Sequence, residues 1–345
     1  MTPVPVYFVT RQIRERWADL AGVPPESIDA ERFRSGIDVW IVQTYLELRG
    51  HAAEAGLDLR ITPRFPRDLP AIAHRDDLRV SARYDRSYLA DTRADRAASP
   101  VATWHVVQSP VQIAERSVLI PLWPQPGLVA RDAARTGMST LGFFGRSGSV
   151  PGFFRDPAFL AALAQRGITY RLSERDWRDY SATDVCVALR YDPAIGASAK
   201  PFSKLVNAWF AEVPALLGPE PAFRWLRRSE LDYLEVNSAR DILAALDRLR
   251  ATPGLYEAMV ANGIARRTAF TRAAIGAQWI AFLAGQFVPS WRVWLQDRPG
   301  EVRRTIDFAR HLWSQRAERN AYKRVEAEQR RRIKAEGLGE RLDLT

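Results

Sequence analysis

The sequence predicts an α/β protein with two parallel-sheet domains and a charged helical tail. Short runs rich in β-branched and aliphatic residues alternate with helical patterns, which favours βα units and a mainly parallel sheet. The alternation stops in a Pro-rich connector near 121–137 and then restarts, which indicates a second domain. From Trp291 to about Glu336 the pattern is helical and dense in charge, as in a solvated helix.

The first half carries five short apolar runs that predict strands. In chain order these runs are 6–10, 58–62, 70–74, 102–110 and 117–127. The stretch 36–56 has the apolar spacing of a helix. We expect this half, residues 1–130, to form one Rossmann-like domain.

The second half repeats the pattern. Strands are expected at 139–146, 168–172, 184–190, 214–218 and 231–236. Helices are expected over 156–167, which a glycine closes, from Lys204 onward, and over 238–263 with a break at Pro253 and Gly254. We expect a second domain over 138–285 and a helical extension over 286–345.

Composition points to an anionic partner. The chain of 345 residues has 50 Lys and Arg against 40 Asp and Glu, and its pI is near 10. Such an excess suits nucleotide phosphate, nucleic acid or an anionic membrane surface. The single cysteine, Cys186, excludes a disulfide framework and a Cys-based metal site, and its apolar neighbours predict a core position.

Nothing in the sequence predicts a membrane span or a secretion signal. The N-terminus has no basic region followed by a long apolar run. The longest apolar region, 273–288, is interrupted by Gln278 and Gln286 and is shorter than a bilayer requires. We therefore expect a cytoplasmic protein.

The stretch KPFSKLVNAWFAEVPALLGPE, residues 200–220, combines a polar first turn with an otherwise buried helix. Ser203 is a suitable N-cap, so the helix is expected to begin at Lys204. Lys204 and Asn207 then share one face, beside the free N–H groups and the positive end of the helix dipole. This arrangement predicts an anion site, most naturally for phosphate and neighbouring hydroxyls.

The stretch FFGRSGS, residues 143–149, is a second anion candidate. Gly145 and Gly148 allow a phosphate to approach the backbone, and Arg146 can hold two oxygens. Both candidates follow predicted strands, and open α/β sheets bind ligands at that edge.

These stretches resemble the C-terminal nucleotide-sugar-binding domain of GT-B glycosyltransferases, over about 120–285. The resemblance implies two Rossmann-like domains facing a cleft, with a sugar nucleotide held mainly by the second. It implies that Arg146 and Lys204 neutralise the donor diphosphate, and that Asn207 and Glu220 lie near the donor. The full donor-binding set expected is Gly145, Arg146, Arg190, Ser203, Lys204, Asn207 and Glu220.

The sequence departs from the family in one informative way. The paired-glutamate motif of many retaining members would need acids at 199 and 207, where this chain has Ala199 and Asn207. Retention of anomeric configuration is therefore not supported by motif.

The first half offers His74 and Asp77 as candidates for a general base, at the end of a predicted strand. The alternative is a helix cap by Asp76 or Asp77 with His74 bonded locally. His105 is a second candidate for the base, but a histidine within an apolar strand is more often a satisfied core residue.

The leading hypothesis is a cytoplasmic glycosyltransferase that moves a sugar from a nucleotide donor to a hydroxyl acceptor. The acceptor would be a carbohydrate or a lipid-linked one, in cell-surface polysaccharide or glycolipid synthesis. No metal and no cofactor are expected, because no Asp-X-Asp motif and no convincing ligand spacing occur. Two alternatives stay open: a nucleotide-sugar epimerase or hydrolase on the same fold, and a basic nucleic-acid-binding protein.

Tryptophans beside arginines in the tail suggest docking to an anionic membrane.

Overall fold

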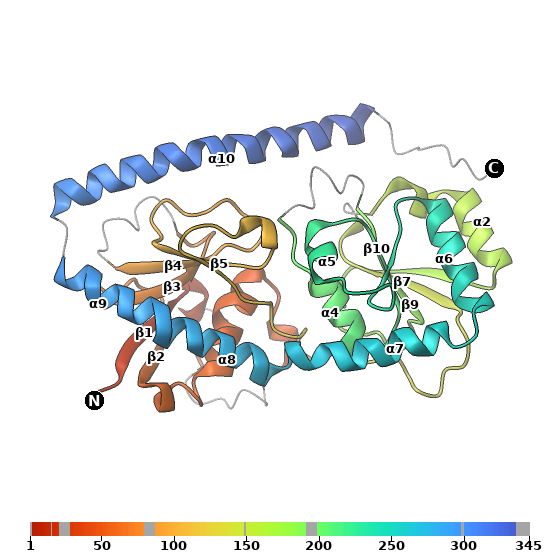
Figure 1. Cartoon of the computed structure of the whole chain (residues 1–345), viewed down its shortest axis with the longest axis horizontal. Coiled ribbons are helices and arrows are strands. Elements are labelled where there is room, and N and C mark those ends of the chain that lie inside the picture. Colours follow the sequence, from red (N-terminus) through yellow and green to blue (C-terminus); the bar gives the residue numbers. More distant parts are fainter. Residues whose placement is uncertain are drawn as a thin grey trace. The chain divides into compact units, whose positions relative to one another are not determined.

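The computed structural model describes residues 2–14, 16–20, 28–78, 87–147, 150–190, 199–297 and 300–335. The chain forms two compact units, Met1–Trp123 with Thr271–Tyr322 and Pro124–Phe270 with Lys323–Thr345. Each unit has a parallel sheet of its own (Figure 1). The domain ranges 1–130, 138–285 and 286–345 stay predictions. They differ from this division chiefly because the helices after residue 270 pack with the first unit.

The first unit contains a six-stranded sheet of order β2-β1-β3-β4-β5-β6, in which every pair is parallel. The strands are β1 (Val4–Val9), β2 (Leu57–Thr62), β3 (Pro70–His74), β4 (Tyr88–Thr92), β5 (Trp104–Val107) and β6 (Ser117–Leu119). Its helical segments are η1 (Arg11–Arg14), η4 (Ala30–Arg32), η5 (Asp38–Gln43), α1 (Thr44–Leu48), η6 (Ala53–Ala55), η8 (Pro110–Gln112), α8 (Arg272–Phe282), η12 (Leu283–Phe287) and α9 (Val288–Gln296).

Strand β4 was not predicted from the sequence. Its five residues are all buried, yet they include an aspartate and a threonine, so the apolar pattern is broken. The Asp91 carboxylate is tolerated there because His105 on the neighbouring strand β5 hydrogen-bonds it, with Nδ1 2.6 Å from Oδ1. His105 thus has a hydrogen-bond partner within the sheet, but it is half-buried rather than a core residue.

The segment α8–α9 packs its aromatic side chains against this sheet. Trp104 meets Phe282 with ring centroids 5.5 Å apart, and Tyr88 meets Trp294 at the same distance. Trp291 is buried and donates from Nε1 to the carbonyl of Asp68 at 3.0 Å. Trp291 is therefore covered by the protein and is not available to a lipid surface, whereas Trp294 is half-buried and its predicted interfacial role stays a prediction.

The second unit contains a five-stranded parallel sheet of order β11-β10-β9-β7-β8. The strands are β7 (Thr140–Phe144), β8 (Thr169–Ser173), β9 (Val185–Ala188), β10 (Ala215–Leu217) and β11 (Leu234–Glu235). The helical segments are η10 (Gly152–Arg155), α2 (Pro157–Gln165), α4 (Ser203–Phe210), α5 (Pro221–Leu226), α6 (Ala239–Ala251), α7 (Leu255–Arg266) and η11 (Arg267–Phe270). Helix α10 (Glu301–Ala335) follows α9, so the charged tail is helical as expected.

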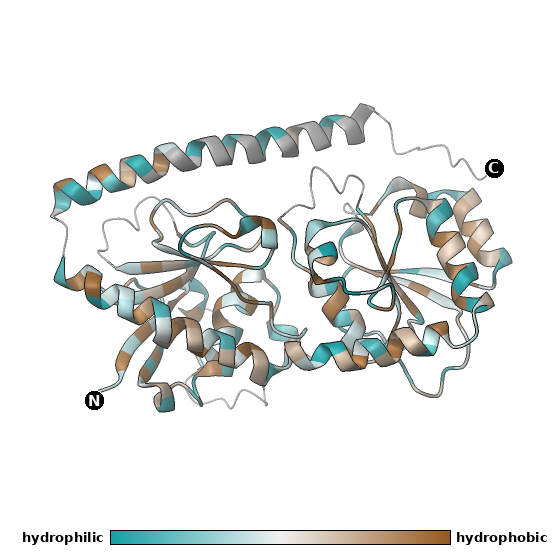
Figure 2. Cartoon of the chain, viewed as in Figure 1, coloured by the Kyte–Doolittle hydropathy of each residue, from teal (hydrophilic) through white to brown (hydrophobic). Residues whose placement is uncertain are grey.

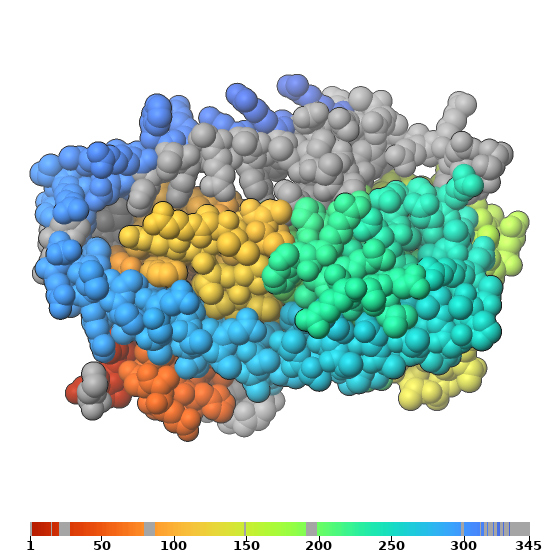
Figure 3. Space-filling model, in the orientation of Figure 1, coloured from red at the N-terminus to blue at the C-terminus, as the bar shows by residue number. Residues whose placement is uncertain are grey.

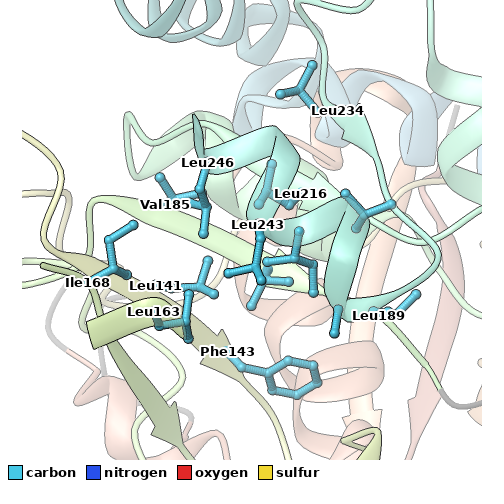
Figure 4. Close-up of a cluster of buried hydrophobic side chains, with 14 of the residues drawn as sticks. Leu141, Phe143, Leu163, Ile168, Val185, Leu189, Leu216, Leu234, Leu243 and Leu246 are labelled. Carbon is cyan, nitrogen blue, oxygen red and sulfur yellow. The ribbon is translucent and has the colours of Figure 1, made fainter. Parts of the chain in front are cut away.

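The core of the second unit lies between this sheet and helices α2, α6 and α7 (Figure 4). Leu141 and Val185 from the sheet meet Leu163 of α2 and Leu246 of α6, and all four are fully buried. Each such side chain contributes about 1.5–3 kcal/mol by leaving water. Cys186 is buried in the same sheet, as expected.

Asp184, just before β9, fixes the connector to the second sheet. Its buried carboxylate accepts from Arg131 Nε and Arg135 Nη2, each at 2.8 Å, and from the backbone N–H of Ser139 and Thr140, each at 2.9 Å. Burial alone would raise the pKa of Asp184, but the hydrogen bonds from Arg135, Ser139 and Arg131 hold it well below its usual range. The carboxylate is therefore charged in the folded protein.

Asp184→Asn is expected to lower the free energy of unfolding by about 3 kcal/mol, because two arginines lose a buried partner. The pKa of Asp184 is depressed in the folded state, so its contribution is present above the unfolded pKa of about 3.9 and is lost as the pH falls further. Urea unfolding from pH 7 down to pH 3 measures both effects. Asp247→Asn, at an exposed pair with Arg166, should change stability by less than about 1 kcal/mol. Equal losses in the two variants would contradict the role given to Asp184.

Candidate functional site

The residues singled out in the second half follow neighbouring strands of the second sheet. Strand order reverses between β7 and β9, which are adjacent although β8 lies between them in the chain. Gly145 and Arg146 follow β7, Arg190 follows β9, and Glu220 follows β10. Open parallel sheets bind ligands outside the carboxyl ends of their strands at such a reversal.

Helix α4 begins one residue earlier than predicted. It starts at Ser203, its N-cap is Phe202, and no side chain caps it, so the assignment of Ser203 as N-cap is wrong. Phe202 is buried against Phe270, with ring centroids 5.7 Å apart, and this packing fixes the start of the helix. The N–H groups of Ser203 and Lys204 have no acceptor within the described ranges of the chain, so they are available to a ligand.

Lys204 projects from the first turn of α4 toward the loop after β7. Its Nζ lies 4.1 Å from the centroid of the Phe143 ring, a cation–π distance. A Cβ on Gly145 would stand 3.3 Å from that Nζ and 3.0 Å from the Phe143 ring, so a side chain there would crowd the ammonium group. Burial, reinforced by the charge of Arg190, lowers the pKa of Lys204 to about 8.

Arg190 and Glu220 form a buried pair beside Lys204. Arg190 Nε lies 2.9 Å from Glu220 Oε1, and Glu220 is only 1% exposed. Glu220 Oε2 has no hydrogen-bond partner among the residues that the structure describes. Burial raises the pKa of Glu220, although Arg190 and Lys204 act in the opposite direction. Among the described residues, three cations act on this one carboxylate, namely Arg190, Lys204 and Lys200. They leave an excess positive charge, which an anion would balance.

Asn207 and Arg146 complete the predicted donor set. Asn207 lies one turn after Lys204 and is half-buried, and its amide makes no hydrogen bond to the described residues. Arg146 is exposed on the loop after Gly145, without an ion pair to any residue that the structure describes. Gly148 lies outside the described residues. The structure thus brings Gly145, Lys204, Arg190 and Glu220 together and leaves Arg146 at the margin.

In the first unit, His74 ends β3 and is 4% exposed. The backbone N–H of Asp76 donates to His74 Nδ1 at 3.2 Å, and a backbone N–H can only donate. Burial lowers the pKa of His74, so the ring is neutral near pH 7 and its proton is on Nε2. Nε2 has no partner and lies 3.4 Å from where a Cβ on Gly36 would stand. In this form Nε2 is a hydrogen-bond donor.

Asp77 lies in the turn that follows His74. Its backbone N–H donates to the His74 carbonyl at 2.9 Å, and its side chain is half-buried. The structure therefore places both predicted base candidates at the carboxyl end of β3. The helix that Asp76 or Asp77 could begin falls largely on residues 79–86, outside the described part of the chain.

Two buried polar residues at the carboxyl ends of β4 and β5 were missed by the sequence analysis. Thr92 is the partner of His74 in the β3–β4 ladder, and Gln108 directly follows β5. Thr92 Oγ1 and Gln108 Oε1 are buried without a hydrogen-bond partner, as is His74 Nε2. No sequence pattern identifies Thr92, because strand β4 itself is not apparent from the sequence.

The described residues contain neither a cluster of metal ligands nor a membrane-spanning helix. No group of three or more His, Cys, Asp or Glu side chains is arranged there to hold a metal ion. None of the helices in that part of the chain is long and apolar enough to cross a membrane.

Sequence comparisons give no relative: no protein-family model and no curated protein matches the chain. Among solved structures, sucrose-phosphate synthase from Thermosynechococcus elongatus is similar with a TM-score of 0.54 and 14% identity, over 84% of this chain and 100% of that chain. The chain has the GT-B fold.

Two other solved structures are similar at lower scores. The GT-B protein HepE of Anabaena, solved with UDP, has a TM-score of 0.47 and 11% identity over 83% of this chain and 100% of its own. The GtfA/B complex has a TM-score of 0.46 and 8% identity over 65% of this chain. This chain spans 58% of the matched chain in that complex. The predicted GT-B resemblance and α/β class are confirmed at the level of fold.

Lys204→Met and Arg190→Met are expected to change the stability of the ligand-free protein in opposite directions. Removing Lys204 removes an unbalanced, partly buried cation, so the free energy of unfolding should rise by up to about 1 kcal/mol at pH 7. Removing Arg190 leaves the buried Glu220 without its partner and should cost about 3 kcal/mol. Urea unfolding of each variant measures these changes.

The pH dependence supplies the control. The pKa of Lys204 is lower in the folded than in the unfolded state, so the folded protein binds fewer protons between about pH 8 and about 10.4. The parent protein should therefore gain stability relative to Lys204→Met as the pH rises through this window. A parallel pH dependence of the two proteins would show that Lys204 is not desolvated.

Proposed function

We propose that the chain is a glycosyltransferase that moves a sugar from a nucleotide-sugar donor to a hydroxyl acceptor. The observation that carries this proposal is the excess positive charge of Lys204 and Arg190 over Glu220, at the strand-order reversal of the second sheet. A nucleoside diphosphate leaving group gains negative charge as the sugar leaves it. Fixed cations and free helix N–H groups at that position stabilise this charge without reorganisation.

Each residue of the second site takes a separate role in this proposal. Lys204 and the first N–H groups of α4 hold the diphosphate, and Arg146 closes on it from the loop after β7. Gly145 leaves room for the Lys204 ammonium group. Asn207 and the free Oε2 of Glu220 receive hydroxyl groups of the donor, because an amide and a carboxylate oxygen both accept from O–H.

The acceptor hydroxyl requires a base in the proposed reaction, and His74 and Asp77 are the two candidates. A neutral His74 whose Nδ1 accepts from Asp76 carries its proton on Nε2, so it would donate to the acceptor oxygen. This tautomer favours Asp77 as the group that takes the proton. No metal and no cofactor beyond the donor enter the proposal, since basic side chains face the diphosphate.

We further propose a cytoplasmic enzyme of cell-surface polysaccharide or glycolipid synthesis. The basic character of the chain, with a net charge of +10, and its resemblance to bacterial GT-B enzymes support this setting. The acceptor would then be a carbohydrate or a lipid-linked sugar.

The central test is calorimetry of Lys204→Ala with the diphosphates of uridine, guanosine, adenosine and thymidine. A charge-assisted contact contributes about 1.5–3 kcal/mol, so affinity for the preferred nucleotide should fall about 10- to 150-fold. Asn207→Ala removes a neutral hydrogen bond and should cost less, about fivefold. Lys323→Ala, an exposed lysine of α10, is the matched control and should bind as the parent does. Unchanged binding by Lys204→Ala would show that the donor site is elsewhere.

Removing the base should separate rate from binding. Asp77→Ala is expected to lower the transfer rate about 100-fold or more while nucleotide affinity stays nearly intact, and His74→Ala should lower the rate less. Single-turnover rates with the donor, beside calorimetry, give this pattern. Full rates in both variants would exclude both residues, and turnover of donor without any acceptor would indicate an epimerase or hydrolase.

Turnover is expected to be independent of divalent metal, because Lys204 and Arg146 supply the charge that a cation would otherwise bring. Rates measured before and after dialysis against a chelator should agree within about twofold, whereas loss of a catalytic metal would remove several kcal/mol of stabilisation. A loss of turnover that magnesium or manganese restores would contradict the prediction.

A further inference from the structure

Helix α10 presents a row of large apolar side chains to solvent. Val302 is 75% exposed, Ile306 49% and Trp313 79%. Their spacings of four and seven residues place all three on one side of the helix. Figure 2 shows hydrophobic and hydrophilic residues alternating along these first turns, and Figure 3 shows the turns at the molecular surface. We define Val302, Ile306 and Trp313 as the apolar stripe.

One large apolar residue of the same helix, Phe308, lies outside the stripe and is buried. It lies five residues before Trp313, roughly 140° around the helix. The whole row from Val302 to Trp313 covers about 17 Å along the helix axis at 1.5 Å per residue. A flat surface could contact all three side chains at once.

Basic residues border the apolar stripe. Arg310 and Arg316 stand three residues before and after Trp313, and both are exposed. Asp307 lies six residues before Trp313, about 120° around the helix and so away from the stripe. Over its whole length α10 has eleven Lys and Arg against five Asp and Glu. The exposed side therefore combines apolar contact with positive charge.

We propose that the apolar stripe and its bordering arginines dock the chain on an anionic lipid surface. An exposed tryptophan is suited to the headgroup region, where its ring meets hydrocarbon and its N–H meets water. Aliphatic neighbours add buried apolar area, and the arginines attract the anionic headgroups. A nucleic-acid backbone would use the arginines but would leave Val302 and Ile306 in water. The docking does not require transferase activity, so the two proposals can fail separately.

The experiment is co-sedimentation of the full chain with vesicles of phosphatidylcholine alone and with about 30% phosphatidylglycerol. The protein should sediment only with the anionic vesicles, and about 0.5 M salt should release most of it. Arg310→Glu with Arg316→Glu should weaken binding at least about tenfold, since each basic residue near the surface contributes roughly a factor of five. Ile306→Ser with Trp313→Ser should weaken it about tenfold as well.

Matched controls use exposed residues of the second unit. Trp177→Ser, and Arg175→Glu with Arg240→Glu, change the same residue types elsewhere and should bind vesicles as the parent does. Circular dichroism of each variant verifies that the helix content is unchanged. Three results would overturn the proposal: equal binding to neutral and anionic vesicles, full binding by the stripe variant, or tighter binding to random duplex DNA than to vesicles.

Discussion

The parallel pairing of the strands is the constraint on which the rest of the structure depends. It brings the carboxyl ends of β7, β9 and β10 to one edge, and the reversal of strand order there separates the connections that follow β7 and β9. Arg190 and Lys204 reach this edge from the connection between β9 and β10, and Glu220 reaches it from the connection between β10 and β11. Removing these charged groups from water is unfavourable, because the cations outnumber the carboxylate. The arrangement is therefore stable only because other parts of the unit stabilise it.

Two features provide that stabilisation. The leucine-rich layer between the sheet and helices α2 and α6 contributes apolar burial, and it extends to Phe143, beneath the Lys204 ammonium group. Asp184, at the amino end of β9, fixes the connector through two arginines and two backbone N–H groups. The strand that carries Arg190 at its carboxyl end is thus held rigidly at its amino end. A rigid frame suits electrostatic stabilisation, because the charges need not reorganise when a ligand arrives.

Features that depend on the local sequence pattern could be predicted, whereas features that depend on contacts between residues distant in sequence could not. The α/β class and most strands followed from apolar runs, and Lys204 stood out because a polar first turn precedes a buried helix. The prediction of Ser203 as N-cap was wrong because Phe202 packs on Phe270, a contact between residues distant in sequence, and the helix therefore begins one residue earlier. Strand β4 and Thr92 were missed because Asp91 breaks the apolar run. That position is acceptable because His105 and the backbone N–H of Ser99 both hydrogen-bond the Asp91 carboxylate.

The two sheets present different polar groups at their carboxyl edges, and this difference supports a division of chemical roles. The second sheet carries an excess cation, which matches a leaving diphosphate. At the end of β3 and β4, by contrast, the unpartnered buried atoms include a neutral imidazole N–H and a hydroxyl, His74 Nε2 and Thr92 Oγ1. A hydroxyl ligand can satisfy such a pair, because it both donates and accepts. An anion could accept from both groups, but it would meet no full positive charge from either of them. The polar groups at the edge of the second sheet thus suit the leaving diphosphate, and those at the edge of the first sheet suit the hydroxyl acceptor of the proposed reaction.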